Sequence, residues 1–425
     1  MHVEKATQAQ LQQWHEELSS KHQSFVAGSL NLDLTRGKPS ASQLSLANAL
    51  DGALNGNYIS ADGTDTRNYG GLDGLPGMKN LAAEILGVTA DEILIGGNSS
   101  LTLMYFSILF AWQFGLNGPG SAWKDEPAAK FLCPVPGYDR HFAICEEFGI
   151  EMINVPMNDN GPDMDAVEAL VRNDKAIKGI WCVPKYSNPT GCIYSAETVE
   201  RLAKLGKIAA GNFRVFYDNA YVVHDLTDEP AELANIMDYC REHGTEDSVL
   251  QFGSTSKVTF AGAGVAFMAC SAANMKAIKN HLGIATIGPD KVNQLRHLNV
   301  IGDMAELRTH MQKHAELLRP RFDCVLKHLQ ENFGDSDLGQ WSTPSGGYFI
   351  SFDTRPGLAS EVVRLAAEAG VKLTPAGATF PYGKDPEDCN IRLAPSFPTV
   401  ADIDKAMQVF CNSVKLASVS QQLKG

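Results

Sequence analysis

The chain has 425 residues, of which 44% are hydrophobic and 20% charged, an ordinary balance for a globular protein with a large core. A formal net charge of −13 argues against a nucleic-acid partner, because nucleic-acid surfaces need clustered lysine and arginine. The same net charge means that an acidic substrate must be attracted locally, by individually placed arginines. The length predicts two domains.

Nine cysteines are scattered along the chain without a CxxC pair, and their number is odd. This pattern favours reduced thiols in a cytoplasm over a disulfide framework or a metal site. The N-terminus is polar and lacks the apolar core of a signal peptide. The longest apolar stretch, residues 101–114, contains polar residues and is too short to cross a bilayer. We therefore expect a cytoplasmic protein with no metal and no membrane partner.

The start of the chain predicts a helix followed by a loop. Apolar residues recur near helical spacing over residues 5–27, which indicates an amphipathic helix that packs against the rest of the protein. Residues 32–39 form an extended run that ends in glycine and proline, which is typical of a loop. This loop carries two cations, Arg36 and Lys38.

A candidate anion site follows. Residues 92–95 predict a strand, and a helix is expected from residue 101 onward. Asn98, Ser99 and Ser100 lie between them, and all three are good N-cap residues. A helix N-terminus attracts anions through its free N–H groups, so this turn is either an anion site or a capped helix that binds nothing.

Strands and helices then alternate. Apolar strands are predicted at residues 131–133, 152–155, 180–183, 215–217 and 249–252, and helices at residues 140–148, 164–171 and 196–210. This alternation predicts a mostly parallel sheet covered by helices on both faces. Ligands bind such sheets outside the carboxyl ends of the strands, which is where the candidate side chains lie: Tyr138, Asn188, Asp218 and Lys257.

The last third of the chain predicts a second, smaller α/β unit. Helices are expected at residues 305–333, 360–369 and 400–416, and strands at residues 346–352 and 391–393. We therefore predict a large domain at residues 46–304, and a small domain that combines residues 1–45 with residues 305–425.

Lys257 is the candidate centre of the chemistry. It follows a predicted strand and lies among glycines and hydroxyls, in Ser254-Thr255-Ser256-Lys257. A lysine in such a place either forms an imine with a carbonyl compound or is an ordinary solvated surface lysine. Three further segments favour the first interpretation: residues 186–191 (YSNPTG), 215–221 (VFYDNAY) and 390–393 (NIRL).

In this order the four segments resemble the class I aminotransferases, which have fold type I and use pyridoxal phosphate (PLP). The nearest likeness is to the aspartate aminotransferase group, in a branch called subgroup Ic with a lysine segment of the pattern S-T-S-K-x-T-F-A-G-A-G. The resemblance covers almost the whole chain. It implies a large domain with a mostly parallel seven-stranded sheet covered by helices, and a smaller α/β domain.

The resemblance also implies roles around the PLP ring. Lys257 would bind the cofactor covalently and carry the substrate proton. Asp218 would pair with the ring nitrogen, and it needs a cationic partner because it ends an apolar strand. Asn188 and Tyr221 would donate to the ring oxygen, and Tyr138 would stack on the ring. The alternatives are a turn asparagine, a capping aspartate and a core tyrosine.

At the phosphate end the resemblance implies Ser99, Ser100, Ser254 and Ser256. Tyr69 lies in a glycine-rich segment, residues 68–77, that lacks the flanking strand and the Gly-Lys-Ser/Thr of a P-loop. The family uses a matching tyrosine across the subunit interface, which implies a homodimer with shared active sites.

The chain departs from the family where many members have a phosphate-binding arginine after the lysine. Ala263 lies in this region, with no arginine nearby. Lys185 is a candidate replacement.

Arginines are the expected substrate ligands. Arg392 lies within an apolar strand and needs an anion, and its planar fork matches the substrate α-carboxylate. Gly37 would lie beside the substrate. For a distal carboxylate, Arg140 is the first candidate and Arg36 the second.

The predicted activity is transfer of the amino group from an L-amino acid, aspartate or glutamate, to a 2-oxo acid such as 2-oxoglutarate or oxaloacetate. Three alternatives stay open. They are an aminotransferase for aromatic, kynurenine-type or alanine substrates, a PLP-dependent β-lyase, and a PLP-dependent transcription regulator. The sequence leaves the ranking of substrates open.

Overall fold

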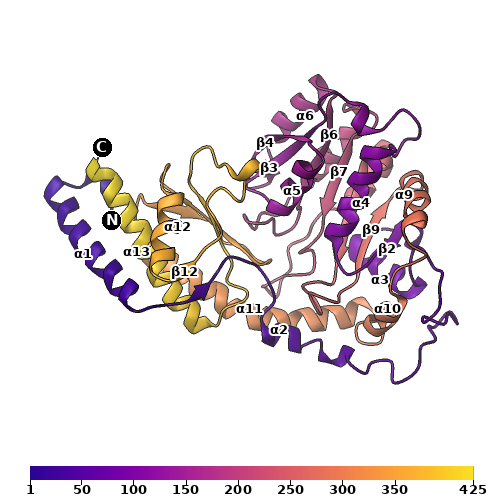
Figure 1. Cartoon of the computed structure of the whole chain (residues 1–425), viewed down its shortest axis with the longest axis horizontal. Helices are drawn as coiled ribbons and strands as arrows, with labels where there is room; N and C mark the ends of the chain where they lie inside the picture. The colour runs from indigo at the N-terminus through magenta and orange to yellow at the C-terminus, as the bar shows by residue number, and fades with distance from the viewer. Residues whose placement is uncertain (425) are drawn as a thin grey trace.

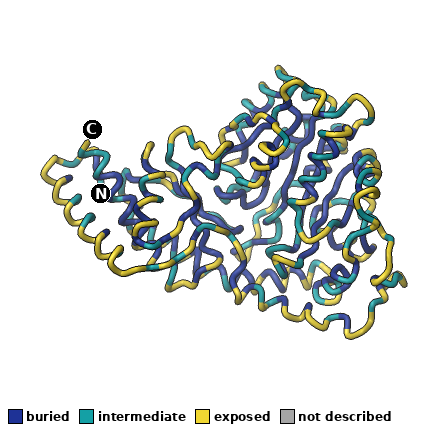
Figure 2. Tube along the Cα trace, in the orientation of Figure 1, coloured by how far each residue is buried: buried dark blue, intermediate teal, exposed yellow. Residues whose placement is uncertain are grey.

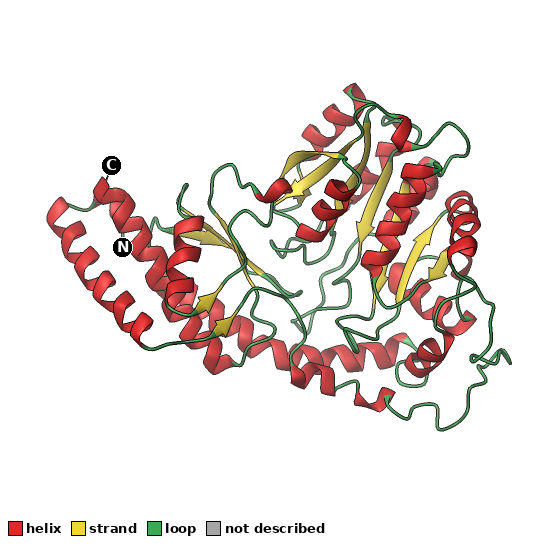
Figure 3. Cartoon of the chain, in the orientation of Figure 1, coloured by secondary structure: helices red, strands yellow, loops and turns green. Residues whose placement is uncertain are grey.

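The computed structural model describes residues 1–424 as a mixed α/β chain built around one large sheet (Figures 1 and 3). Eight strands lie in the order β2-β9-β8-β7-β6-β3-β4-β5. Their bounds are β2 (Ile93–Ile95), β3 (Lys130–Val135), β4 (Glu151–Asn158), β5 (Gly161–Pro162), β6 (Ile177–Cys182), β7 (Arg214–Asp218), β8 (Val249–Ser254) and β9 (Ala266–Cys270). The sheet has one strand more than the predicted seven, since the two-residue β5 pairs antiparallel to the end of β4.

The centre of the sheet is parallel, as predicted. Strands β4, β3, β6, β7 and β8 pair in parallel, whereas β9 runs antiparallel to both of its neighbours, β8 and β2. Strands β6 and β7 are buried at every position. Burial on both faces explains why these strands are continuous apolar runs in the sequence. At Gly179 in β6 there is no room for a side chain, because a Cβ would overlap the ring of Phe131.

Helices cover both faces of this sheet. One face packs on α4 (Ser100–Gln113), α5 (Asp139–Glu147) and α9 (Ala272–Ala285). The other packs on α6 (Met164–Asn173), α7 (Ala196–Lys204) and α8 (Ile236–His243). The β2–β9 edge is covered by α3 (Pro76–Leu86) and α10 (Lys291–Leu298). Six strands and α-helices of this half were not predicted from the sequence: β5, β9, α3, α8, α9 and α10.

The rest of the chain forms a smaller body with its own core. It contains the antiparallel sheet β10-β11-β13 and the parallel pair β1-β12. The strands are β1 (Leu32–Asp33), β10 (Gly339–Trp341), β11 (Ile350–Thr354), β12 (Val371–Lys372) and β13 (Asn390–Leu393). The helices are α1 (Gln8–Ala27), α2 (Ala41–Ser45), α11 (Met304–Phe333), α12 (Ala359–Glu368) and α13 (Val400–Lys424).

The expected strand at residues 346–352 is partly wrong, since β11 begins only at Ile350. The two glycines before it pass directly over the ring of Tyr186, where a Cβ on either residue would collide. Gly347 also has a φ of +81°, which interrupts the extended backbone.

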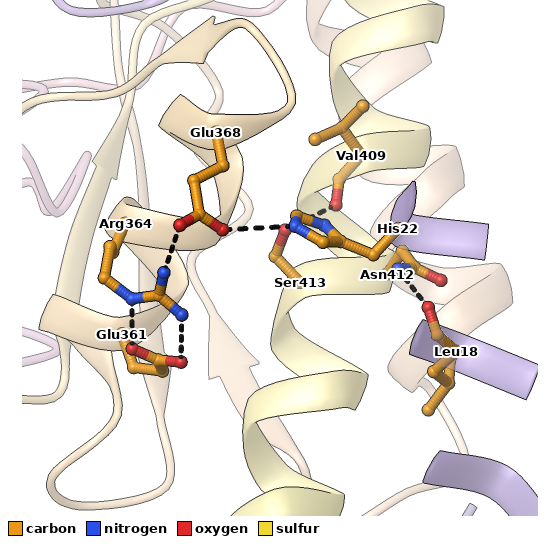
Figure 4. A network of polar contacts seen from close by, with 8 residues as sticks. All are labelled: Leu18, His22, Glu361, Arg364, Glu368, Val409, Asn412 and Ser413. Atoms are coloured by element: carbon orange, nitrogen blue, oxygen red, sulfur yellow. Dashed lines mark hydrogen bonds and ion pairs between the residues drawn. The ribbon is translucent and has the colours of Figure 1, made fainter. Parts of the chain in front are cut away.

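Helix α1 confirms the predicted N-terminal helix and lies along α13 with its outer face exposed (Figures 1 and 2). Two polar contacts attach it (Figure 4). Asn412 Nδ2 donates to the carbonyl oxygen of Leu18 at 3.2 Å, and His22 Nε2 lies 3.3 Å from Glu368 Oε2. Glu368 is the last residue of α12, so its contact with His22 joins α1 to α12. The same carboxylate also pairs with Arg364 within α12.

Helix α11 connects the two bodies. Leu307 and Met311, near its start, pack with Val258 beside the large sheet, and its second half enters the core of the smaller body. The division into residues 46–304 and residues 1–45 with 305–425 stays a prediction. Within residues 1–424, no helix combines the length and apolar character that crossing a bilayer requires.

Candidate active site

Two adjoining cavities lie at the carboxyl ends of the central strands. The inner cavity holds about 870 Å³ of empty space and the outer one about 1140 Å³. They share four lining residues: Tyr138, Asn188, Tyr221 and Lys257. Each comes from a segment that follows a strand, so the parallel arrangement of β3, β6, β7 and β8 brings them to one edge of the sheet.

Almost all the residues predicted from the sequence line these two cavities. The inner one is lined by Ser99, Ser100, Asp218, Ser254 and Ser256 in addition to the shared four. The outer one is lined by Arg36, Gly37, Arg140 and Arg392. Tyr69 and Lys185 are the exceptions; Tyr69 lies on an exposed loop and is 84% accessible.

Asp218 lies at the end of β7 and contacts a residue that the sequence analysis missed. Its Oδ2 is 3.0 Å from His141 Nε2, and the His141 ring stacks on Trp181 at 4.3 Å between centroids. Within residues 1–424, Asp218 Oδ1 is buried and has no hydrogen-bond partner. A buried carboxylate oxygen without a partner needs a donor, and Asp218 is a lining residue of the inner cavity.

His141 is the buried side chain that meets Asp218 at the end of β7. It lies three residues after Tyr138, on the buried side of α5 together with Phe142 and Cys145. A polar side chain among apolar neighbours on one helix face was the available signal, but its partner is 77 positions away in the sequence.

Lys257 is only partly exposed and lines both cavities, contrary to the alternative of a solvated surface lysine. Burial lowers the pKa of its ammonium group, and the charge of Asp218 opposes that effect. Its Nζ lies 4.8 Å from the centre of the Tyr221 ring. A lowered pKa increases the fraction of neutral amine, which is the nucleophilic form.

The two tyrosines of the inner cavity stay protonated. Burial, followed by the charges of Asp218 and Asp139, raises the pKa of Tyr138 to about 12. Burial also raises the pKa of Tyr221 well above its usual value. A protonated phenol can donate a hydrogen bond to a ligand oxygen.

The far end of the inner cavity is built for an anion. Ser99 is the N-cap of α4, yet its side chain makes no capping hydrogen bond to any described residue, so the expected cap is not formed. Ser254 Oγ donates to Ser256 Oγ at 3.1 Å, and Ser256 Oγ donates to the carbonyl oxygen of Asn98 at 3.0 Å. Hydroxyls and a helix N-terminus therefore converge here.

Lys185 does not belong to this anion site. Its ammonium group forms an ion pair with Asp225 at 2.8 Å and donates to the carbonyl oxygen of Val222 at 3.2 Å. It lines neither of the two cavities. Among the described residues that line the inner cavity, Lys257 is the one cation. The prediction that Lys185 replaces the missing phosphate-binding arginine is therefore wrong.

Arg392 lies in β13 and is nearly buried beside the outer cavity. Its Nη1 lies 3.2 Å from Asp139 Oδ1 and 3.3 Å from Asn188 Oδ1, and its guanidinium group stacks over Phe349 at 4.9 Å. Asp139 is thus the anion that the apolar strand required. Within the described chain, Arg392 Nε has no hydrogen-bond partner, which leaves donor capacity for a ligand carboxylate.

Gly37 lines the same cavity. A Cβ at this position would overlap the ring of Phe349, so the close approach of the loop to β11 requires glycine. The loop also carries Arg36, and Arg140 comes from the first turn of α5.

The donor set fits PLP. The buried Asp218 oxygen can accept from a protonated ring nitrogen, the Lys257 amine can bind an aldehyde, and the N-terminus of α4 with its serines can hold a phosphate. With the doubly covered sheet, this arrangement defines an enzyme of the PLP-dependent fold type I class.

Comparison with known proteins agrees with that class and narrows it. A family model described as "Aspartate amino-transferase" matches residues 6–425. An aspartate aminotransferase from Corynebacterium glutamicum is 48% identical over 95% of this chain and 94% of its own. The crystal structure of an aspartate transaminase from C. glutamicum has a TM-score of 0.96 at 46% identity, covering 99% of both chains. An α-aminoadipate aminotransferase from Thermus thermophilus shares the fold, with a TM-score of 0.73 at 21% identity over 92% of this chain and 93% of that one. The chain belongs to the aspartate aminotransferase family and is an aminotransferase.

Proposed function

We propose that the protein transfers the amino group between L-aspartate or L-glutamate and a 2-oxo acid, 2-oxoglutarate or oxaloacetate, with PLP bound at Lys257. One observation carries the proposal. Three arginines, Arg36, Arg140 and Arg392, line the cavity that adjoins the Lys257 amine. A substrate with two carboxylates needs two separate cationic partners, and this cavity offers them in a protein of net negative charge.

In this proposal the cofactor is held at its ring nitrogen, its phosphate, its ring oxygen and one face of its ring. Asp218, supported by His141, accepts from the ring nitrogen, and the turn at Ser99 and Ser100 with Ser254 and Ser256 binds the phosphate. When bound, PLP acts as an electron sink for the bond that breaks at the substrate α-carbon. Asn188 and Tyr221 donate to the ring oxygen, and Tyr138 covers one face of the ring.

Lys257 moves the proton. Its amine lines the cavities and has a lowered pKa, so it is available in the neutral form that accepts a proton from carbon. Tyr221 lies beside it, with Nζ 4.8 Å from the ring centre.

The substrate is held at its two ends. Arg392 binds the α-carboxylate, which replaces Asp139 as the anionic partner of Arg392. Gly37 leaves space beside the bound carboxylate. Arg140 binds the distal carboxylate, with Arg36 as the second candidate. Asp139 directly precedes Arg140 in the first turn of α5. Displacement of the Asp139 carboxylate from Arg392 therefore acts on the same turn that carries Arg140.

We further propose a homodimer in which the partner subunit's Tyr69 reaches the phosphate. Exposure supports this assembly. Tyr69, Ile284 and Ile287 are 84%, 89% and 62% accessible, and Ile284 is in the last turn of α9. The loop that carries Tyr69 lies against the segment after α9, since a Cβ at Gly288 would lie 2.8 Å from the Gly70 carbonyl oxygen. Large exposed side chains on neighbouring segments are typical of a surface that another protein covers.

The visible absorption spectrum of the purified protein tests the proposal. Addition of L-aspartate or L-glutamate, but not L-alanine or L-phenylalanine, should convert the band of lysine-bound cofactor to the spectrum of its aminated form. Conversion by phenylalanine or alanine would remove the diacid specificity. Release of ammonia and pyruvate would indicate a β-lyase instead. Absence of the band after PLP is added would overturn the role of Lys257.

Variants of the outer cavity separate the two distal candidates. Arg140→Ala should lower kcat/KM for aspartate much more than for alanine, by about 2–5 kcal/mol of selective binding energy. Arg36→Ala is the parallel variant, and Arg172→Ala, at an exposed position of α6, is the control. If Arg140→Ala lowered kcat/KM equally for both amino acids, Arg140 would not bind the distal carboxylate.

A further inference from the structure

A buried polar network contacts the backbone of Lys257 and Val258, and its side chains line neither of the two cavities. Its five side chains are between 0% and 7% exposed and come from α2, α11, the segment after β7 and the segment before β11: Gln43, His224, His310, His314 and Tyr348. Burial of so many polar groups is unfavourable unless each has its hydrogen-bond partner. Within residues 1–424, His224 Nδ1 is the one buried side-chain atom of these five residues without a hydrogen-bond partner.

Four of these side chains converge on two consecutive backbone carbonyls. The Lys257 oxygen accepts from Tyr348 Oη at 3.3 Å and lies 3.4 Å from His224 Nε2. The Val258 oxygen lies 2.9 Å from His314 Nε2 and 2.6 Å from His310 Nε2. A carbonyl oxygen only accepts, so each of these ring nitrogens must carry the hydrogen.

Gln43 closes the network. Because His314 Nε2 carries the hydrogen, the neutral ring presents a lone pair at Nδ1, which lies 3.2 Å from Gln43 Nε2. The same amide nitrogen donates to Tyr348 Oη at 2.9 Å, so the phenol hydrogen is free to point at Lys257. Gln43 Oε1 accepts from the backbone N–H of Ser40 at 3.1 Å. At the other end of the chain, His310 Nε2 and His314 Nε2 share the Val258 oxygen and lie 3.2 Å apart.

The network requires neutral histidines. Burial lowers the pKa of His314 to about 4 and that of His224 to about 3, and it also lowers the pKa of His310. The charged groups that act on these rings are cations: Lys257 and Lys185 on His224, and Lys313 on His310. A proton on His314 Nδ1 would oppose the Gln43 amide.

Gln43 connects the network to the substrate loop. Residues 35–38, which line the outer cavity, end two positions before Ser40, the residue whose N–H Gln43 accepts. Ser396 Oγ donates to the carbonyl oxygen of Lys38 at 3.0 Å, which anchors the loop from its other side. One side chain thus lies between the loop and the backbone of Lys257.

We propose that Gln43, acting through Tyr348 and His314, is a positioning residue that couples the substrate loop at residues 35–38 to the backbone of Lys257. It touches neither substrate nor cofactor. When a carboxylate ligand orders the loop, the hydrogen bonds from Ser40 through Gln43 and Tyr348 fix the position of the Lys257 carbonyl. The fixed backbone in turn orients the Lys257 amine. The inference rests on the proposed role of Lys257 in the reaction.

Hydrogen exchange of the holoenzyme tests the coupling, with succinate as an unreactive dicarboxylate probe. In the wild type, succinate should slow exchange in residues 35–40 and in residues 255–260 together. In Gln43→Met, which keeps the side-chain length but removes both polar atoms, succinate should slow only the loop. Exchange at residues 255–260 should be about fivefold faster, the factor that corresponds to one lost hydrogen bond.

Tyr348→Phe is the second variant, since it removes one hydroxyl and keeps the ring. Tyr194→Phe is the matched control, since Tyr194 is a buried tyrosine that packs with α6, α7 and α8 on the large sheet. The titration of the visible cofactor band should shift by about half a pH unit in Tyr348→Phe and not in the control.

Joint protection of both segments in Gln43→Met, or an unshifted titration in Tyr348→Phe, would overturn the relay. The proposed function fails separately, through the absence of a cofactor band in the wild type. The exchange comparison among the variants still decides whether Gln43 holds the Lys257 backbone, because it needs no catalysis.

Discussion

His224 offers a direct measurement of how the buried network responds to acid. It is 3% exposed, and burial, followed by the charges of His314 and Lys257, lowers its pKa to about 3. An unfolded histidine titrates near about 6.5. At about pH 5 the unfolded side chain is therefore almost fully protonated and the folded one almost fully neutral, so unfolding takes up about one proton at this residue.

The sign of the stability effect follows from the lowered pKa. The free energy of unfolding is unaffected by this group above about pH 6.5, and it decreases as the pH falls from there toward the folded pKa of about 3. At about pH 5 the decrease is about 2 kcal/mol for His224 alone. His314 acts in the same direction, with a folded pKa of about 4.

Calorimetric unfolding in two buffers of different ionisation enthalpy counts the protons without assuming a two-state transition. His224→Gln should take up about one proton fewer than the wild type at about pH 5 and the same number near pH 8. His15→Gln, at a partly exposed position of α1, is the control. Equal proton uptake by His224→Gln and the wild type at the acidic pH would refute the reasoning.

Three further predictions concern the site and the sheet. Arg392→Lys should raise KM for every amino-acid substrate by an amount that corresponds to about 2–5 kcal/mol, because all substrates share the α-carboxylate; steady-state kinetics that show an effect on diacids alone would contradict its role. Asp218→Asn should lower kcat and speed loss of cofactor absorbance on dialysis, since a charge-assisted hydrogen bond of about 1.5–3 kcal/mol is lost; unchanged retention would argue against the contact with the ring nitrogen. Gly179→Ala should lower the thermal midpoint of unfolding and leave KM unchanged, because a methyl group forced against Phe131 destabilises the core by about 1–3 kcal/mol. An unaltered midpoint would mean that the Phe131 ring moves aside freely.

The sequence by itself determined the fold class and most of the candidate residues. Strand–helix alternation and fully apolar strands are local patterns, and they predict a parallel sheet with both faces covered. The carboxyl ends of parallel strands meet at one edge, so residues such as Tyr138, Asn188 and Asp218 could be expected to meet around one site before any tertiary structure was known.

Local patterns could not decide strand direction or the element boundaries that packing sets. Strand β9 is apolar at nearly every position, which suits either direction, and its antiparallel course depends on its neighbours β2 and β8. The strand expected at residues 346–352 begins only at Ile350, because contact with Tyr186 fixes the two preceding glycines.

Only the tertiary structure decided which polar groups meet. His141 and Asp218 are 77 positions apart, and Gln43 and His314 are 271 apart. A side chain's own type and spacing say that it needs a partner when it is buried, but not which distant residue supplies it. That choice depends on how the layers pack, which is why the four lysine-site segments were predictable and the network that contacts the backbone of Lys257 was not.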